Sequence, residues 1–350
     1  MELKEEVTTY SKLSLSIRSR LLNYVSEIVD KSMRQRVATD KIQFLSQYIA
    51  KAEPRRVFET YASVDAASGV LSMNIGFIGL YGSLAVIFPD LKRFFTSESF
   101  GIFPENPGEL TKFSSPHIFN LALDIRREKS LIVTAIELAR EYNVELILLD
   151  GPLIPPFNVP MKGDWILARR EYVDYVSKLM ELIDVCKELG VSLSGFVKRP
   201  KSKILVNCSI GDVLRPLVGS NVFDHVIADF ILREKGEFFP IINGKLDSVA
   251  LEFNGRKINV SFVFLKTSRS TSPYRLDIAN TAGDKKPTDI ISFILSDLTS
   301  EGIPFSILKV DEEVKMSKRL MKELYDDVVH SIAYKYGKIS LVNLVWGEEL

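Results

Sequence analysis

A short, almost continuous run of apolar residues constrains the fold of this chain more than any other feature. Residues 144–149 (VELILL) are followed at once by Asp150 and a Gly-Pro pair, and stretches with helical periodicity flank them at about 118–142 and 165–189. Strands that are buried on both faces show such unbroken apolar runs, and they are typical of the centre of a helix-covered sheet. The sequence therefore predicts an α/β fold whose central strand ends at Asp150.

Other segments that are rich in β-forming residues complete the expected sheet. Ala66–Gly69 and Gly79–Gly82 provide turn residues, and together with their flanks they predict an antiparallel meander of three short strands at 57–65, 70–78 and 83–88. Later strands are expected at 191–197, 274–278 and 304–310, and a last helix is expected to begin at Asp311. Residues 1–55 carry apolar positions at helical spacing and predict a helical arm for packing, dimerisation or partner contact. Residues 56–350 are expected to form one domain.

Composition excludes several classes of protein. The 350 residues include 45 Lys+Arg and 45 Asp+Glu, so the formal net charge is zero, and 46% of the residues are hydrophobic. This balance argues against disorder and against a histone-like protein that holds phosphates by overall charge, although a local basic groove remains compatible with it.

Cys186 and Cys208 show neither a disulfide framework nor metal-ligand spacing, and we expect both in the core. The acidic N-terminus lacks the pattern of a signal peptide, and the longest apolar run is too short to span a bilayer, so we expect a cytoplasmic protein without membrane contact.

Four acidic residues stand at positions where ligands gather in α/β proteins. Asp65 is expected to end the first strand, Asp150 the central strand and Asp311 the last strand, and the crevice at strand ends is the usual ligand site. Glu128 lies on the expected helix before the central strand. It shares a helical face with Leu131, Ile132, Ala135 and Leu138, so it points toward the sheet. An inward-pointing charge is unfavourable unless it is paired or bound to a metal.

Each of these residues also has a purely structural explanation. A strand-ending Asp often begins a turn or caps a helix, which would account for Asp65, Asp150 and Asp311. Glu128 lies next to Arg127 and Lys129 in the sequence and could form a boundary salt bridge. A single arrangement in which all four converge explains their placement together.

The order of these elements resembles that of ribonuclease H-like nucleases, and more narrowly that of the NurA family. The resemblance rests on five segments in the same order, between about residues 56 and 315: 63–68 (SVDAAS), 146–153 (LILLDGPL), 195–198 (GFVK), 274–278 (YRLDI), and 302–304 (GIP) leading to 310–311 (VD). Three positions differ from the family pattern. Ala66 follows Asp65 where the family usually has Gly, Ile303 stands where many members have Tyr, and Asp311 stands where some members have His.

The resemblance implies a fold and an activity. The fold would be a ribonuclease H-like mixed sheet flanked by helices, with an N-terminal helical arm. The activity would be that of a metal-dependent archaeal deoxyribonuclease, a single-strand endonuclease and a 5′–3′ exonuclease on single- and double-stranded DNA. Such an enzyme processes DNA ends for recombinational repair as a homodimer, with a HerA-type hexameric helicase/ATPase, and it associates with the nucleoid when engaged on DNA.

These residue types suit phosphodiester hydrolysis with hard cations. Two divalent ions would activate water and stabilise the leaving oxygen, and carboxylate oxygens favour Mn²⁺ or Mg²⁺ where no His/Cys cluster favours zinc. We expect Asp65, Glu128, Asp150 and Asp311 to be the metal ligands, with pKa values raised as a group when no metal is bound. Lys198 begins a basic run at 198–203 that would face the substrate phosphate, although ordinary surface charge also explains such a run.

Two other functions remain open from the sequence. The chain has no Gly-x-x-x-x-Gly-Lys-Ser/Thr motif, so ATP hydrolysis would have to come from a partner. A non-catalytic DNA-binding or scaffold subunit of the same fold is one alternative. A two-metal nuclease that acts on RNA or on RNA–DNA hybrids is the other.

Overall fold

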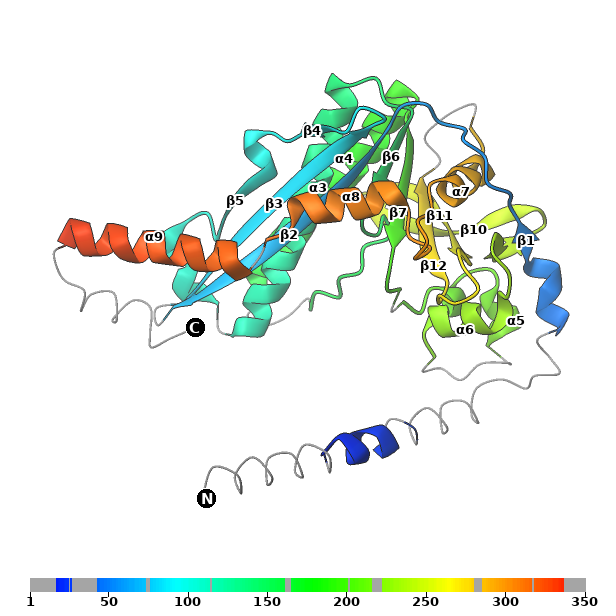
Figure 1. Ribbon diagram of the computed structural model, residues 1–350, viewed down its shortest axis with the longest axis horizontal. Helices are drawn as coiled ribbons and strands as arrows, with labels where there is room; N and C mark the ends of the chain where they lie inside the picture. Colours follow the sequence, from blue (N-terminus) through cyan, green and yellow to red (C-terminus); the bar gives the residue numbers. More distant parts are fainter. Residues whose placement is uncertain are drawn as a thin grey trace, which may run out of the picture.

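The protein is built around a large mixed sheet with helices on both faces (Figure 1). The computed structural model describes residues 17–24, 26, 43–73, 76–113, 115–160, 165–200, 202–215, 222–279, 285–316 and 318–336. Within these residues the sheet has 12 strands. They are β1 (Ala50–Lys51), β2 (Tyr61–Met73), β3 (Gly76–Phe88), β4 (Lys92–Phe94), β5 (Phe100–Phe103), β6 (Leu146–Leu149), β7 (Ser192–Val197), β8 (Glu237–Phe239), β9 (Ile241–Ile242), β10 (Lys245–Phe253), β11 (Arg256–Leu265) and β12 (Tyr274–Ala279).

The strand order places β6 in the middle of the sheet. Neighbouring strands follow the order β1-β8-β11-β12-β7-β6-β2-β3-β4, while β5 also pairs with β3, and β10 pairs with β11 and β9. The central strands β2, β6 and β7 are parallel, whereas β3 and β12 are antiparallel to their neighbours. This is the ribonuclease H-like mixed sheet that the sequence predicts, and the apolar run before Asp150 is its fully buried central strand.

Two helical layers cover the sheet. The α-helices are α3 (Pro116–Glu141), α4 (Ile166–Leu189), α5 (Gly211–Leu214), α6 (Asp224–Ile231), α7 (Pro287–Ser296), α8 (Phe305–Val314) and α9 (Lys318–Tyr336), and the 3-10 helices are η1 (Gln43–Tyr48), η2 (Ser97–Ser99), η3 (Pro107–Lys112) and η4 (Leu205–Asn207). Helices α3 and α4 pack in one core cluster, while α7 and α8 pack in another on the opposite face. Figure 1 shows α8 across the near side of β2 and β3, with α3 and α4 behind the sheet.

Several local predictions are confirmed. Helix α3 covers the expected segment, and α4 ends at Gly190, whose φ of 71° is the left-handed conformation that suits a glycine at a helix C-terminus. Strands β7 and β12 lie where the sequence places them. Cys186 is buried in the core and Cys208 is partly buried, and both are free thiols.

The predicted three-stranded meander is wrong. Residues 57–88 contain two long strands, β2 and β3, and no turn occurs at Ala66–Gly69, which pairs continuously with β3. The chain reverses between Met73 and Gly76 instead, so Asp65 lies within β2 and does not end it. Gly79 of β3 serves packing, because a Cβ at this position would lie 2.6 Å from the side chain of Leu123 on α3.

The predicted last strand is also wrong. Residues 305–314 form helix α8, so Asp311 lies inside a helix, and the next helix, α9, begins at Lys318. The β-branched residues in this segment suggested a strand. Their spacing is helical, however, since Ile307 and Val310 are three residues apart and both are buried against the sheet. Asp311 is four residues after Ile307, so it shares the helix face that is directed at β2.

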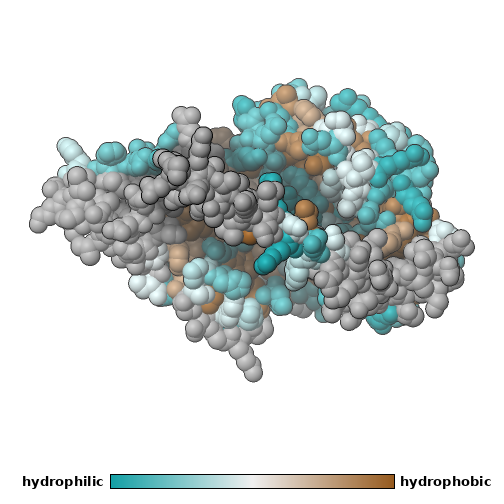
Figure 2. Space-filling model, turned by 60° about the horizontal axis from the view of Figure 1, so that its bottom comes forward, coloured by the Kyte–Doolittle hydropathy of each residue, from teal (hydrophilic) through white to brown (hydrophobic). Residues whose placement is uncertain are grey.

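The N-terminal arm is described only in part. Residues 17–24 are helical, as predicted, and most of the remaining arm lies outside the described residues. Strand β1 pairs with β8, so the end of the predicted arm joins the sheet. The helices in the described ranges include none that is long and apolar enough to cross a bilayer. In the view of Figure 2, hydrophilic residues cover most of the described surface, with apolar residues in small groups between them.

The start of α8 is held by a partly buried carboxylate at the end of α7. The Asp297 Oδ2 atom accepts hydrogen bonds from the Ser306 backbone N–H (3.0 Å) and the Ser306 hydroxyl (2.6 Å), and Oδ1 accepts one from the Tyr61 hydroxyl (3.4 Å). Burial and the negative charge of Asp297 raise the pKa of Tyr61, so this hydroxyl remains a donor. Asp297 therefore connects α7, α8 and β2.

We expect Asp297→Ala to lower the free energy of unfolding by about 2–4 kcal/mol, because three donors lose their shared acceptor in a largely buried place. Urea denaturation measures this loss. Asp212→Ala is the control, because that side chain is 86% exposed in a surface ion pair, and its loss should change the value by less than about 0.5 kcal/mol. Equal effects of the two substitutions would contradict this role of Asp297.

Candidate metal centre

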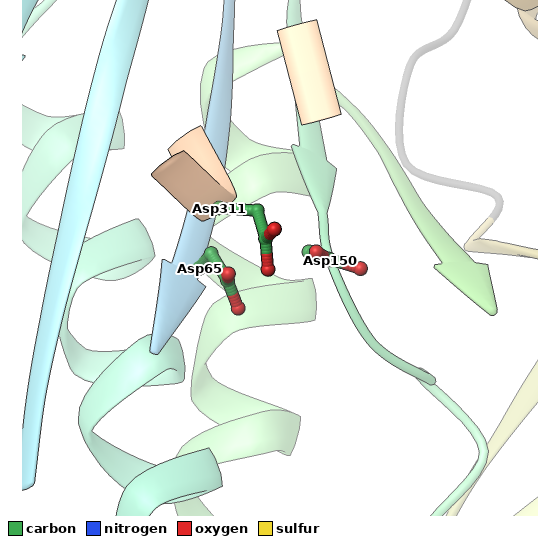
Figure 3. Close-up of side chains that lie close together, drawn as sticks. All are labelled: Asp65, Asp150 and Asp311. Carbon is green, nitrogen blue, oxygen red and sulfur yellow. The ribbon is translucent and has the colours of Figure 1, made fainter. Parts of the chain in front are cut away.

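Three carboxylates from separate elements converge at one point. Asp65, Asp150 and Asp311 each place one oxygen within 4.8 Å of the others. They come from β2, from the turn after β6 and from α8, and Figure 3 shows their side chains close together. In the part of the chain that the structure describes, no other group of three acidic, His or Cys side chains has this geometry.

The pairing of β2 with β6 brings the first two carboxylates together. Val64 and Leu149 are partners in this parallel pair, and the Asp150 backbone N–H donates to the Val64 carbonyl at 2.8 Å. The next residue on each strand is therefore also side by side, and both side chains leave the same face of the sheet. That face is the one covered by α8, which contributes Asp311.

The electrostatics of the site disfavour the ionised state of Asp65 and Asp150 when no cation is bound. The pKa of Asp65 is raised to about 8, mainly by burial and then by the charge of Asp150, with a smaller contribution from Asp311, while the Ala66 N–H and Lys198 oppose the rise. Burial likewise raises the pKa of Asp150 to about 6, with contributions from Asp311 and Glu128 opposed by Lys198. The predicted rise in pKa is thus confirmed for Asp65 and Asp150.

Lys198 lies beside the acidic group at the end of β7. Its Nζ is 2.6 Å from Asp150 Oδ2 and 3.8 Å from Asp311 Oδ1. Burial lowers the pKa of Lys198, but Asp150 and Asp311 outweigh this effect and the net shift is upward, so the side chain stays cationic. Of the rest of the basic run, Lys203 lies over the Phe223 ring (6.0 Å), and Lys201 lies outside the described residues.

Glu128 is placed differently from the other three predicted ligands. It is directed inward, as its helical face predicts, and its Oε1 accepts a hydrogen bond from Arg127 Nη2 at 2.6 Å. Burial raises the pKa of Glu128, and Arg127 opposes that rise. Because α3 covers the face opposite α8, Glu128 does not join the group of three. Its Oε2 lies 3.3 Å from the place of a Cβ on Gly151, so it contacts the turn that follows Asp150. Its role as a metal ligand stays a prediction.

A buried ion pair next to the site has no predicted role in the sequence analysis. Arg275 and Asp277 are 4% and 0% exposed, and Arg275 Nε donates to Asp277 Oδ1 at 2.8 Å. In the sequence both residues stand out only as part of the segment 274–278 (YRLDI). The sequence does carry a signal for this ion pair, since an acid and a base stand two residues apart in an apolar strand. Residues at this spacing share one face of a strand, and charges that are buried there need a partner.

The residues of the group suit a hard divalent cation. All three donors are carboxylate oxygens, and no His or Cys belongs to the group. Oxygen donors of this kind favour Mg²⁺, Ca²⁺ and Mn²⁺ over zinc or copper. A divalent cation would also relieve the repulsion that raises the pKa values of Asp65 and Asp150.

Comparisons with known proteins agree on one family. A family model described as the NurA domain matches residues 59–316. The fold is similar to the NurA nuclease from Sulfolobus solfataricus, with a TM-score of 0.59, 16% identity, and coverage of 91% of this chain and 97% of that chain.

Two further crystal structures have a similar fold. A NurA structure with manganese has a TM-score of 0.59 at 11% identity, with coverage of 90% of this chain and 98% of that chain. Another NurA structure has a TM-score of 0.52 at 11% identity, with coverage of 88% and 97%. No curated protein matched the chain in a sequence search.

The raised pKa values predict a pH dependence of stability without metal. The folded chain keeps protons on Asp65 and Asp150 at pH values where the unfolded chain has lost them, so these groups lower stability as pH rises from about 4 to about 8. Asp65→Asn resembles the protonated side chain. In the presence of a chelator, we expect its melting temperature relative to wild type to increase between pH 5 and pH 8.

Differential scanning fluorimetry across this pH range measures the difference. Asp212→Asn, a change at an exposed surface ion pair, is the control and should follow wild type at every pH. A constant difference between Asp65→Asn and wild type would contradict the raised pKa of Asp65.

Proposed function

The chain belongs to the NurA family, and from this premise we propose that it is a metal-dependent deoxyribonuclease whose active site is formed by Asp65, Asp150 and Asp311. One observation carries the proposal. Three carboxylates from β2, the end of β6 and α8 converge within 4.8 Å of one another, in surroundings that raise the pKa of Asp65 and Asp150. A cluster of this kind suits divalent cations, whose charge offsets the repulsion among the carboxylates.

The proposed cofactor is Mn²⁺ or Mg²⁺, with two ions at the site. The carboxylate donors support hard cations, and the solved NurA structure with manganese, which shares the fold, supports Mn²⁺. When bound, the metal supplies Lewis acidity and positive charge beside the scissile phosphate. Asp65 and Asp150 would hold it from the sheet and Asp311 from the helical layer. Glu128, behind the turn after Asp150, is proposed as a further ligand.

Lys198 is proposed to contact the substrate. Its ammonium group is 2.6 Å from Asp150 and about one-quarter of its side chain is exposed, so it lies at the boundary between the acidic group and solvent. A cation at this place would attract a phosphate oxygen and position the phosphodiester next to Asp150. The same cation limits repulsion among the carboxylates when no metal is bound.

The biological role that we propose follows from membership of the family. The enzyme would act as a single-strand endonuclease and a 5′–3′ exonuclease on single- and double-stranded DNA, and it would process DNA ends for recombinational repair. It would work as a homodimer in the cytoplasm with a HerA-type hexameric ATPase, and the absence of a P-loop motif in this chain is consistent with ATP hydrolysis by a partner.

We expect Asp150→Asn to reduce Mn²⁺-dependent DNA cleavage by about 100-fold or more, because the neutral amide removes a charged ligand for the metal. The melting temperature without metal should equal or exceed that of wild type, since the substitution removes a carboxylate from a repelling group. Glu137→Gln is the matched control on the exposed side of α3 and should cleave like wild type. Full cleavage by folded Asp150→Asn would contradict the assigned site.

The choice of substrate distinguishes the proposal from its alternatives. Labelled single-stranded DNA, duplex DNA, RNA and an RNA–DNA hybrid are incubated with Mn²⁺, alone and with a HerA-type ATPase plus ATP. We expect DNA to be cleaved, with loss of exonuclease products when the 5′ end is blocked. Faster cleavage of RNA or hybrid would support the alternative nuclease, and intact substrates under every condition would support the scaffold.

A further inference from the structure

The turn that follows Asp150 is held by a carboxylate that is not part of the acidic group. Asp277 lies in β12 and is completely buried. Its Oδ2 accepts the backbone N–H groups of Leu153 and Ile154, each at 3.0 Å, across a separation of more than 120 residues in the sequence. These two hydrogen bonds fix the turn only three and four residues after Asp150.

A glycine allows the turn to reach this carboxylate. Gly195 of β7 lies between β12 and β6, since it pairs with Asp277 of β12 on one side and with Leu149 of β6 on the other. A Cβ on Gly195 would lie 2.4 Å from the Gly151 carbonyl oxygen and 3.0 Å from the Leu153 nitrogen. Any side chain at this position would therefore push the turn away from β7, and from Asp277 beyond it.

Arg275 fixes the orientation of the Asp277 carboxylate. Its Nε donates to Oδ1 at 2.8 Å and its Nη2 donates to Oδ2 at 3.0 Å, and both side chains are almost inaccessible to solvent. A buried ion pair of this kind contributes little net stability, because desolvation of the two charges offsets their attraction. Its retention behind the turn that follows Asp150 calls for another explanation, which the two bonds to the turn provide.

We propose that Asp277 is a positioning residue for the metal site, acting through the backbone of residues 151–154. On one side of Asp150, its own N–H is bonded to the Val64 carbonyl at 2.8 Å; on the other, Asp277 holds Leu153 and Ile154. With both flanks fixed, the Asp150 carboxylate is ordered before the cation arrives, so binding costs less conformational entropy. The inference rests on the proposed role of Asp150 as a metal ligand.

Two substitutions separate positioning from simple structural support. Asp277→Ala and Asp277→Asn both remove the ion pair with Arg275, but only Asn keeps an oxygen that can accept the two N–H groups of the turn. We expect Asp277→Ala to weaken Mn²⁺ binding by about 10- to 100-fold, as for other residues that orient metal ligands. Asp277→Asn should recover most of that affinity.

A double variant ensures that the test is made on folded protein. Arg275→Met with Asp277→Ala replaces the ion pair by apolar side chains, a change that often leaves stability unaltered. It should retain the weak Mn²⁺ binding of the Ala variant. The control is Asp247→Ala, because Asp247 is also buried and also accepts a backbone N–H, that of Ile210 (3.1 Å), in β10 away from the site. It should lower the melting temperature and leave Mn²⁺ affinity unchanged.

Titration calorimetry with Mn²⁺ and the Mn²⁺-induced rise in melting temperature provide readouts that are independent of cleavage. Wild-type affinity in the folded double variant would overturn the positioning role, as would equally weak binding by Asp277→Asn and Asp277→Ala. Failure of the wild-type protein to bind Mn²⁺ would instead contradict the proposed function. The two failures are therefore distinguishable.

Discussion

The parallel pairing of β2 with β6 is the constraint on which the rest of the site depends. The register of Val64 with Leu149 places Asp65 and Asp150 side by side on one face of the sheet, and no side-chain rotation can separate them widely. Two buried like charges at neighbouring positions are unfavourable, and the raised pKa values of both groups express this cost. The apolar interactions of the central strands hold the carboxylates together against their repulsion. The fold therefore maintains an arrangement that a bound cation would stabilise.

The third carboxylate depends on a different part of the molecule. Asp311 lies on α8, in the layer above the sheet, and its position is set where that helix begins and where it ends. Asp297 holds the beginning through Ser306, and near the end Glu313 forms a bidentate pair with Arg93 of β4. The sheet and the α8 layer thus meet at the acidic group, and a displacement of either would open it. This explains why residues without any contact to substrate could control metal binding.

The sequence predicts some parts of this arrangement better than others, for physical reasons. Asp65 and Asp150 are identifiable because they interrupt or end apolar strands, where a carboxylate needs a reason to be present. The sequence identifies Asp311 as a candidate but places it at the end of a strand, whereas it lies in a helix. The β-branched residues before it suggest a strand, although their three-residue spacing is helical. The inward face of Glu128 follows from helical periodicity. Periodicity cannot reveal, however, that α3 lies on the face opposite α8, because that depends on chain topology.

Asp277 and Asp297 show why the supporting residues escaped sequence analysis. Their importance comes from hydrogen bonds to backbone groups, and backbone donors carry no residue-specific signal. The same physics makes these residues effective, since a backbone N–H that is bonded to a buried or partly buried carboxylate fixes the chain whatever side chain it bears. In this protein such carboxylates hold both the turn after Asp150 and the start of the helix that carries Asp311. The three candidate ligands can then exchange protons for a cation, while hydrogen bonds from other residues determine the positions of the backbone that carries them.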